Sequence, residues 1–210
     1  MRSPSEKMLG GKVEIEQALI DTPEFQQLKE VIENTLWHNN ERVYDHALFV
    51  LKNLKQIIEE VPETVQVKLK EKTGERSRQE LLSIATILHD ISKTECIVTN
   101  ENGTTSCPDH EETGAGKAVE ILKRFGLSEA ELDYISEIIR SHALTDAIFT
   151  PDNKISEEAH KELKNRFLNS IYIELMLLTF ADAMSEYTVV SNPEEYALKM
   201  DFYRREVKSL

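Results

Sequence analysis

Residues 81–93 read LLSIATILHDISK, and this stretch decides the fold. From Leu81 to Ile91 the side chains are apolar almost all the way round a helix, so the sequence predicts a central, buried helix. His89 and Asp90 interrupt that apolar run. A buried carboxylate without a partner costs several kcal/mol, so Asp90 must be ion-paired, protonated or bound to a metal ion.

The rest of the chain shows helical periodicity nearly throughout, which predicts an all-α fold. Its 210 residues are enough for one compact domain, and 40% hydrophobic residues can supply a core. Seven Gly and six Pro are too few for a sandwich or barrel built on tight turns. We expect a flexible leader over residues 1–20 and a single domain over 21–210. The patterns predict helices over about 23–37, 41–60, 81–91, 109–125, 128–143, 156–169, 171–190 and 193–208.

Two segments depart from the helical pattern. Residues 61–79 form a surface insertion, whose basic part, 67–78, is expected to be a solvated loop rather than a substrate-facing lid. Residues 95–107 predict a small β-hairpin or ordered loop around Asn102 and Gly103. Cys96 and Cys107 flank that hairpin and could approach each other, but a reducing cytoplasm argues against a structural disulfide.

The charge balance excludes several classes of partner. Lys and Arg number 25 against 38 Asp and Glu, a formal net charge of -13. Such acidity repels phosphate backbones and anionic membrane surfaces, so we expect no long nucleic acid and no membrane as partner. There is no apolar run of the ~18 residues that a membrane helix needs, and no signal peptide core near Met1. The sequence therefore predicts a cytoplasmic protein.

Other polar residues also fall on apolar helix faces. His46 lies on the stripe of Val43 and Val50, and Asp182 lies within IYIELMLLTFADAM. One inward His is more often a hydrogen-bonded core residue than a ligand. Six such residues would each need a separate partner, whereas together they supply the ligands of a one- or two-metal hydrolytic site. The full set is His46, His89, Asp90, His110, His142 and Asp182.

The two remaining histidines offer a contrast. His38 stands at the predicted end of a helix, and His160 stands among Glu and Lys residues. We expect both to be ordinary surface residues.

The order of these residues resembles the HD-domain superfamily of metal-dependent phosphohydrolases over about residues 36–190. The most specific part of this resemblance is the adjacent pair His89 and Asp90, followed three residues later by Lys93. Locally, VYDHALFVLKNL, ILHDISK and DHEETGAGKAVEILKRFGLS are most similar to the HD domain appended to bacterial tRNA nucleotidyltransferases. No nucleotidyltransferase head accompanies them, so we expect a stand-alone HD protein.

The resemblance implies an HD-type helical bundle and one or two divalent metal ions, chosen among Mn, Fe, Co, Ni, Zn and Mg. In similar dinuclear members one metal is held by His46, His89, Asp90 and Asp182, and the second by His110, His142 and a bridging Asp90. A bridging water would be acidified to a hydroxide nucleophile. Asp90 and Lys93 are the candidate catalytic residues. Lys93 either neutralises a phosphate oxygen or forms an ion pair with Asp90.

The resemblance leaves the substrate open among small phosphoesters, with a nucleotide-like molecule expected. The segment at Ser141 to Leu144 lacks the motif of cyclic-di-GMP phosphodiesterases, and Ile91 to Lys93 replaces the acidic pair of alarmone hydrolases. Two alternatives remain. HD-fold mixed-valent di-iron oxygenases use a very similar ligand set, and a non-catalytic regulatory module would keep metal for stability only. A homodimer is possible.

Overall fold

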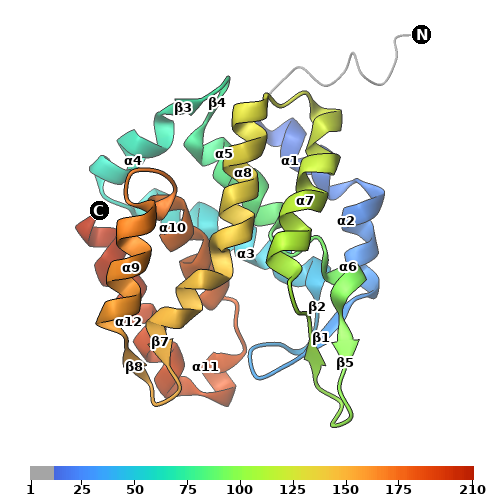
Figure 1. Cartoon of the computed structure of the whole chain (residues 1–210), viewed down its shortest axis with the longest axis vertical. Helices are drawn as coiled ribbons and strands as arrows, with labels where there is room; N and C mark the ends of the chain where they lie inside the picture. The colour runs from blue at the N-terminus through green and yellow to red at the C-terminus, as the bar shows by residue number, and fades with distance from the viewer. Residues whose placement is uncertain (1–11) are drawn as a thin grey trace.

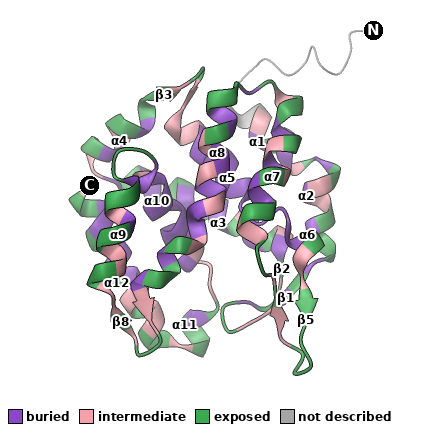
Figure 2. Cartoon of the chain, in the orientation of Figure 1, coloured by how far each residue is buried: buried purple, intermediate pink, exposed green. Residues whose placement is uncertain are grey.

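Three helices form the centre of the fold in the computed structural model, which describes residues 12–210 (Figure 1). They are α3 (Val43–Glu60), α5 (Arg78–Leu88) and α10 (Tyr172–Ala183). α3 packs against both of the other two. Every residue of α5 from Leu81 to Leu88 is buried, and the buried residues gather on these central helices in Figure 2. The predicted all-α fold and its central helix are confirmed.

The other helices surround this centre. α7 (His110–Leu122) and α8 (Glu129–Ser141) form a close pair, and α8 also packs on α5. α12 (Pro193–Ser209) packs along α10, and α9 (Glu157–Phe167) lies beside it in Figure 1. The remaining helices and single helical turns are α1 (Lys12–Ile20), α2 (Pro23–Gln27), η2 (Leu28–Glu30), α4 (Glu63–Lys70), α6 (Lys93–Cys96), η3 (Lys123–Phe125), η4 (His142–Ile148) and α11 (Thr188–Ser191).

Strands occur within the described residues only as four short antiparallel hairpins. No helix of this part of the chain is both long and apolar enough to cross a lipid bilayer. The hairpins are β1 (Ile32–Asn34) with β2 (Asn39–Arg42), β3 (Lys72–Thr73) with β4 (Arg76–Ser77), β5 (Val98–Thr99) with β6 (Thr105–Ser106), and β7 (Phe149–Thr150) with β8 (Lys154–Ile155).

The N-terminal part differs from the prediction. Residues 12–20 of the expected leader form α1, and Leu19 is fully buried, while residues 1–11 lie outside the described part. The helix predicted over 23–37 ends at Gln27. It gives way to η2 and then to β1, where the β-branched pair Val31 and Ile32 favours extended backbone.

The segment 61–79 is more ordered than a solvated loop. Val65 and Leu69 of α4 are buried in the core. Of the basic residues that follow, Arg76 contacts the buried Glu131 at 3.1 Å and Arg78 contacts the fully buried Glu174 at 2.8 Å. The expectation of a solvated surface loop is therefore wrong, because these two guanidinium groups compensate carboxylates that the bundle buries.

The hairpin predicted within 95–107 is confirmed as β5 and β6, with α6 leading into it. Cys96 and Cys107 are joined by a disulfide, with their Cα atoms 5.1 Å apart. The expectation that the two cysteines remain unlinked is therefore wrong. Reducing conditions are a property of the surroundings, whereas the hairpin register sets how close the two side chains come.

Removing the cation beside Glu174 should strongly destabilise the fold. Arg78 Nε and one terminal nitrogen each lie 2.8 Å from a Glu174 oxygen. Because Arg78→Ala leaves that buried carboxylate without its cation, we expect the free energy of unfolding to fall by about 3–5 kcal/mol. Urea unfolding measures this.

The matched control is Arg205→Ala, which removes a largely exposed ion pair with Asp201. Its expected cost is under about 1 kcal/mol. Equal costs for the two variants would contradict the role given to Arg78.

The disulfide should contribute measurably to stability. It links residues 11 positions apart, for which the chain-entropy model gives about 3 kcal/mol. The double variant Cys96→Ser, Cys107→Ser should lose that amount in urea unfolding. Dithiothreitol should lower the urea midpoint of unfolding of the unmodified protein and leave the urea midpoint of the double variant unchanged. An unmodified protein insensitive to dithiothreitol would show that the link adds no stability.

Candidate metal centre

The six predicted residues come together at the ends of five elements. His46 lies in the first turn of α3, His110 is the first residue of α7 and Asp182 lies in the last turn of α10. His89 and His142 directly follow the last residues of α5 and α8. Asp90 comes next in the chain, in the turn between α5 and α6. A cluster of helix ends lets short side chains from several directions meet without breaking any helix.

Asp90 is the common neighbour of this cluster. Its Oδ2 lies 3.2 Å from His89 Nε2 and 3.9 Å from His46 Nε2, whereas its Oδ1 lies 3.6 Å from His110 Nε2. Asp182 Oδ1 lies 3.0 Å from His46 Nε2. The two oxygens of Asp90 therefore face different histidines.

Three of the histidines are oriented by the backbone. Each bonds through Nδ1 to the carbonyl oxygen three residues earlier. These contacts are His89 to Thr86 at 2.8 Å, His110 to Cys107 at 3.0 Å and His142 to Ile139 at 2.7 Å. A carbonyl only accepts, so Nδ1 carries the proton and Nε2 keeps its lone pair. Metal-bound histidines are commonly fixed in this way.

The donor set fits a divalent metal. Two trios, one of His46, His89 and Asp90 and one of Asp90, His110 and His142, each offer ligand atoms within 4.8 Å of one another. His89 Nε2 is buried and makes no hydrogen bond to any described residue. Such an orphaned lone pair is costly unless something binds it. Imidazole with carboxylate suits Mn, Fe, Co, Ni or Zn.

Lys93 is held inside the cluster. Its Nζ lies 3.0 Å from Asp90 Oδ2 and 2.7 Å from Glu33 Oε2, and its side chain is buried. Burial alone would lower the pKa of Lys93, but the two carboxylates hold it above its usual value. This geometry favours the ion pair with Asp90. Sequence reasoning missed Glu33, which lies on β1 with no local signal of burial.

His38 corrects a second expectation, because it is buried against the centre. Its ring centre lies 4.5 Å from that of His46, and its Nδ1 lies 3.0 Å from Glu41 Oε2. The same carboxylate oxygen lies 3.5 Å from His46 Nδ1. Burial opposes the charge of Glu41, yet the two imidazoles lower its pKa to about 2. Glu41 therefore places a negative charge behind His46 without a hydrogen bond to its Nδ1, and ligand atoms of His38, Glu41 and His46 also lie within 4.8 Å of one another.

The electrostatics differ across the cluster. Burial disfavours the charged ring of His46, but Asp182 and Glu41 raise its pKa to about 10. Burial and the neighbouring His89 lower the pKa of His142 to about 4. The half of the cluster with Asp182 thus attracts positive charge strongly, while the His142 ring stays neutral and able to donate a lone pair.

Close packing fixes His110. A Cβ atom on Gly114 would lie 3.3 Å from Ser92 Oγ and 3.4 Å from the carbonyl oxygen of His89. Ser92 Oγ in turn donates to the carbonyl oxygen of His110 at 2.8 Å. The small residue, one turn into α7, lets the start of that helix pack directly on the His89 turn.

The cluster opens to solvent on the side of α10 and η4. The Asp182 side chain is 26% exposed, against 2% for Asp90. Asp146 on η4 is exposed, yet crowding by protein raises its pKa to about 6. Burial also raises the pKa of Glu186, just after α10. Asp182 and Asp146 are therefore the carboxylates that reach solvent on this side, whereas Glu186 is largely buried against Lys199 at 3.0 Å.

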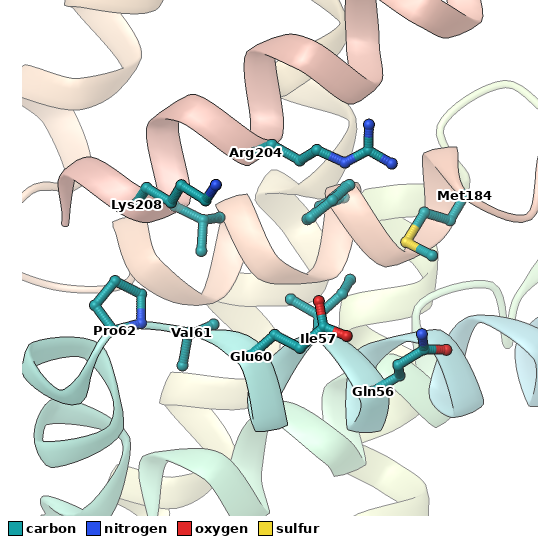
Figure 3. Close-up of a pocket in the computed structure, with 10 residues that line it drawn as sticks. Gln56, Ile57, Glu60, Val61, Pro62, Met184, Arg204 and Lys208 are labelled. Atoms are coloured by element: carbon teal, nitrogen blue, oxygen red, sulfur yellow. The ribbon is translucent and has the colours of Figure 1, made fainter.

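Two further features lie outside the centre. His160 is not an ordinary surface residue, because its Nε2 lies 2.9 Å from Tyr172 Oη and its ring packs on Phe202. A separate hollow of about 310 Å³ lies between α3, α10 and α12 (Figure 3). Its lining includes Ile57, Met184 and Arg204 but no member of the metal cluster.

The comparisons with known proteins agree with this geometry. The HD domain family model matches residues 43–186, more than half of the chain. The chain belongs to the HD domain family. It is 27% identical over 198 residues to the bifunctional uridylyltransferase/uridylyl-removing enzyme of Bordetella avium (strain 197N), covering 90% of this chain. The matched part is 21% of that relative, so this chain spans about a fifth of its length.

Asp90 should be required for metal binding. Asp90→Ala removes the carboxylate shared by both trios. After loading with Mn²⁺ under anoxia, we therefore expect this variant to retain no bound metal, whereas the unmodified protein retains it. Metal content after desalting, measured by plasma mass spectrometry, checks this.

Asp133→Ala, an exposed position on α8, is the control and should keep the full metal content. Circular dichroism confirms that both variants fold. Undiminished metal in Asp90→Ala would contradict the centre.

Proposed function

We propose that this protein is a metal-dependent phosphohydrolase that cleaves a small, nucleotide-like phosphomonoester or phosphodiester. The observation that carries the proposal is Asp90, whose Oδ2 faces His89 and His46 and whose Oδ1 faces His110 in a buried cluster. Members of this family are mostly metal-dependent phosphohydrolases. The name of the Bordetella avium relative includes a uridylyl-removing activity, and a uridylyl group is a uridine nucleotide group. This name supports a nucleotide-like substrate.

The proposed ligand division takes the two trios and adds Asp182, which lies 3.0 Å from His46, to the first. His46, His89, Asp90 and Asp182 would hold one divalent ion, and Asp90, His110 and His142 a second. Bound there, the ions would lower the pKa of water enough to supply a hydroxide nucleophile near neutral pH, and would supply positive charge for the phosphoryl oxygens.

The protein's own groups would prepare this chemistry. The backbone contacts of His89, His110 and His142 fix three imidazoles before any substrate arrives, so no reorganisation is needed during the reaction. Lys93 keeps Asp90 ionised and in place through its contact at 3.0 Å. We assign Lys93 to positioning Asp90, with Glu33 as its second anchor.

The proposal is tested by an anoxic hydrolysis screen. Nucleoside monophosphates, p-nitrophenyl phosphate and bis(p-nitrophenyl) phosphate are incubated with Mn²⁺- or Fe²⁺-loaded protein. We expect release of phosphate or nitrophenol that falls to background in Asp90→Ala and is unchanged in Asp133→Ala. No turnover with either metal would overturn the proposal, and oxygen uptake by the iron form would indicate an oxygenase instead.

A further inference from the structure

Five exposed apolar side chains gather where two segments meet beside the metal centre. We name this group the aromatic rim, and its members are Leu36, Trp37, Tyr187, Val189 and Val190, which are between 37% and 73% exposed. The Tyr187 N–H donates to the Trp37 carbonyl oxygen at 2.6 Å, and Ser191 Oγ donates to that of Leu36 at 2.8 Å. One backbone and one side-chain hydrogen bond therefore hold the β1–β2 loop and the α11 segment together (Figure 1).

Both segments of the rim come directly from the centre. Trp37 precedes His38, whose ring lies 4.5 Å from that of His46. Tyr187 follows Asp182 by five residues, after the turn in which Ser185 Oγ donates to the Asp182 carbonyl oxygen at 2.6 Å. This turn leaves α10 at its open, partly exposed end. The rim thus borders the side on which a substrate would enter.

The two rings of the rim lack partners in the protein. Among the residues that the structure describes, neither Trp37 nor Tyr187 makes a ring–ring or cation–π contact. Their indole N–H and phenol O–H make no hydrogen bond within the same part of the chain. Large aromatic side chains that are exposed beside a metal cluster are suited to a planar ligand.

We infer that Trp37 and Tyr187 bind the base of a nucleotide whose phosphate lies at the metal centre. The inference rests on the proposed function and narrows its substrate to phosphoesters that carry a nucleobase. Every base has an aromatic face that can stack on such side chains, so stacking does not depend on which base is present. Among the exposed apolar side chains on this side of the cluster, which also include Leu144 on η4, Trp37 and Tyr187 are the two that carry an aromatic ring for a base to stack on.

The single tryptophan gives a direct binding assay. Because Trp37 is the chain's one Trp, its fluorescence reports the rim alone. Adenosine and uridine 5′-monophosphates should quench it in the Mn²⁺-loaded protein, whereas ribose 5-phosphate should not. Absence of quenching, or equal quenching by ribose 5-phosphate, would overturn the inference whether or not the protein hydrolyses anything.

Kinetics separate the inference from the proposed function. Trp37→Ala should raise KM for a nucleoside monophosphate about tenfold while leaving kcat, and KM for ribose 5-phosphate, unchanged. Trp37→Phe should recover most of the loss because it keeps a stacking ring. Leu168→Ala, exposed at the end of α9, is the control and should change neither constant.

The outcomes distinguish three cases. Turnover of all phosphoesters with the same KM in Trp37→Ala would overturn the rim while the proposed function stands. Absence of turnover in the unmodified protein would overturn the proposed function, and fluorescence would then decide the rim. In the third case, sedimentation shows a dimer that Trp37→Ala abolishes, and nucleotides do not quench the fluorescence of the unmodified protein. The rim would then bind a second copy of the chain, and the inference would be overturned.

Discussion

The structure depends on one constraint, which is that the carboxylate of Asp90 must be compensated inside the apolar core. Its side chain is 2% exposed, and burial opposes its charge. The neighbouring His89 and the ammonium of Lys93 nevertheless hold its pKa well below the usual value. Because Lys93 reaches Asp90 only from the first turn of α6, the turn that follows α5 has to be tight. Glu33 then balances Lys93, and this contact ties the β1 hairpin to the same turn.

The same constraint explains why helix ends gather at the centre. A side chain in the middle of a helix approaches its neighbours from one direction only, whereas the ends of α3, α5, α7, α8 and α10 bring donors from five directions. The backbone carbonyls near the last turns of α5 and α8 are free to accept, so they orient His89 and His142. Gly114 lets α7 approach closely enough for His110 to join.

The parts of the site that could be predicted from sequence are those whose local pattern contradicts their polarity. His46 and Asp182 stand on strongly apolar helix faces, and His89 with Asp90 follows an apolar run, so periodicity alone marks them. Glu33, His38 and Glu41 carry no such signal, because they lie in or beside a hairpin whose burial is set by contacts distant in sequence. The fold shows the same division. Amphipathic helices such as α3 were predictable, whereas the ordered 61–79 segment depends on Glu131 and Glu174 far along the chain.

The acidity of the site links metal to substrate. Asp182, Asp146 and Glu186 line or adjoin its open side, and the chain as a whole has a formal net charge of -13. The one lysine within the cluster, Lys93, already forms ion pairs with two carboxylates, so its charge is compensated and does not attract a phosphate. A phosphoester could approach these groups only if bound cations reversed the local potential. Under the proposed function, a phosphorylated substrate would therefore bind only together with divalent metal, because the groups on the open side of the cluster are acidic.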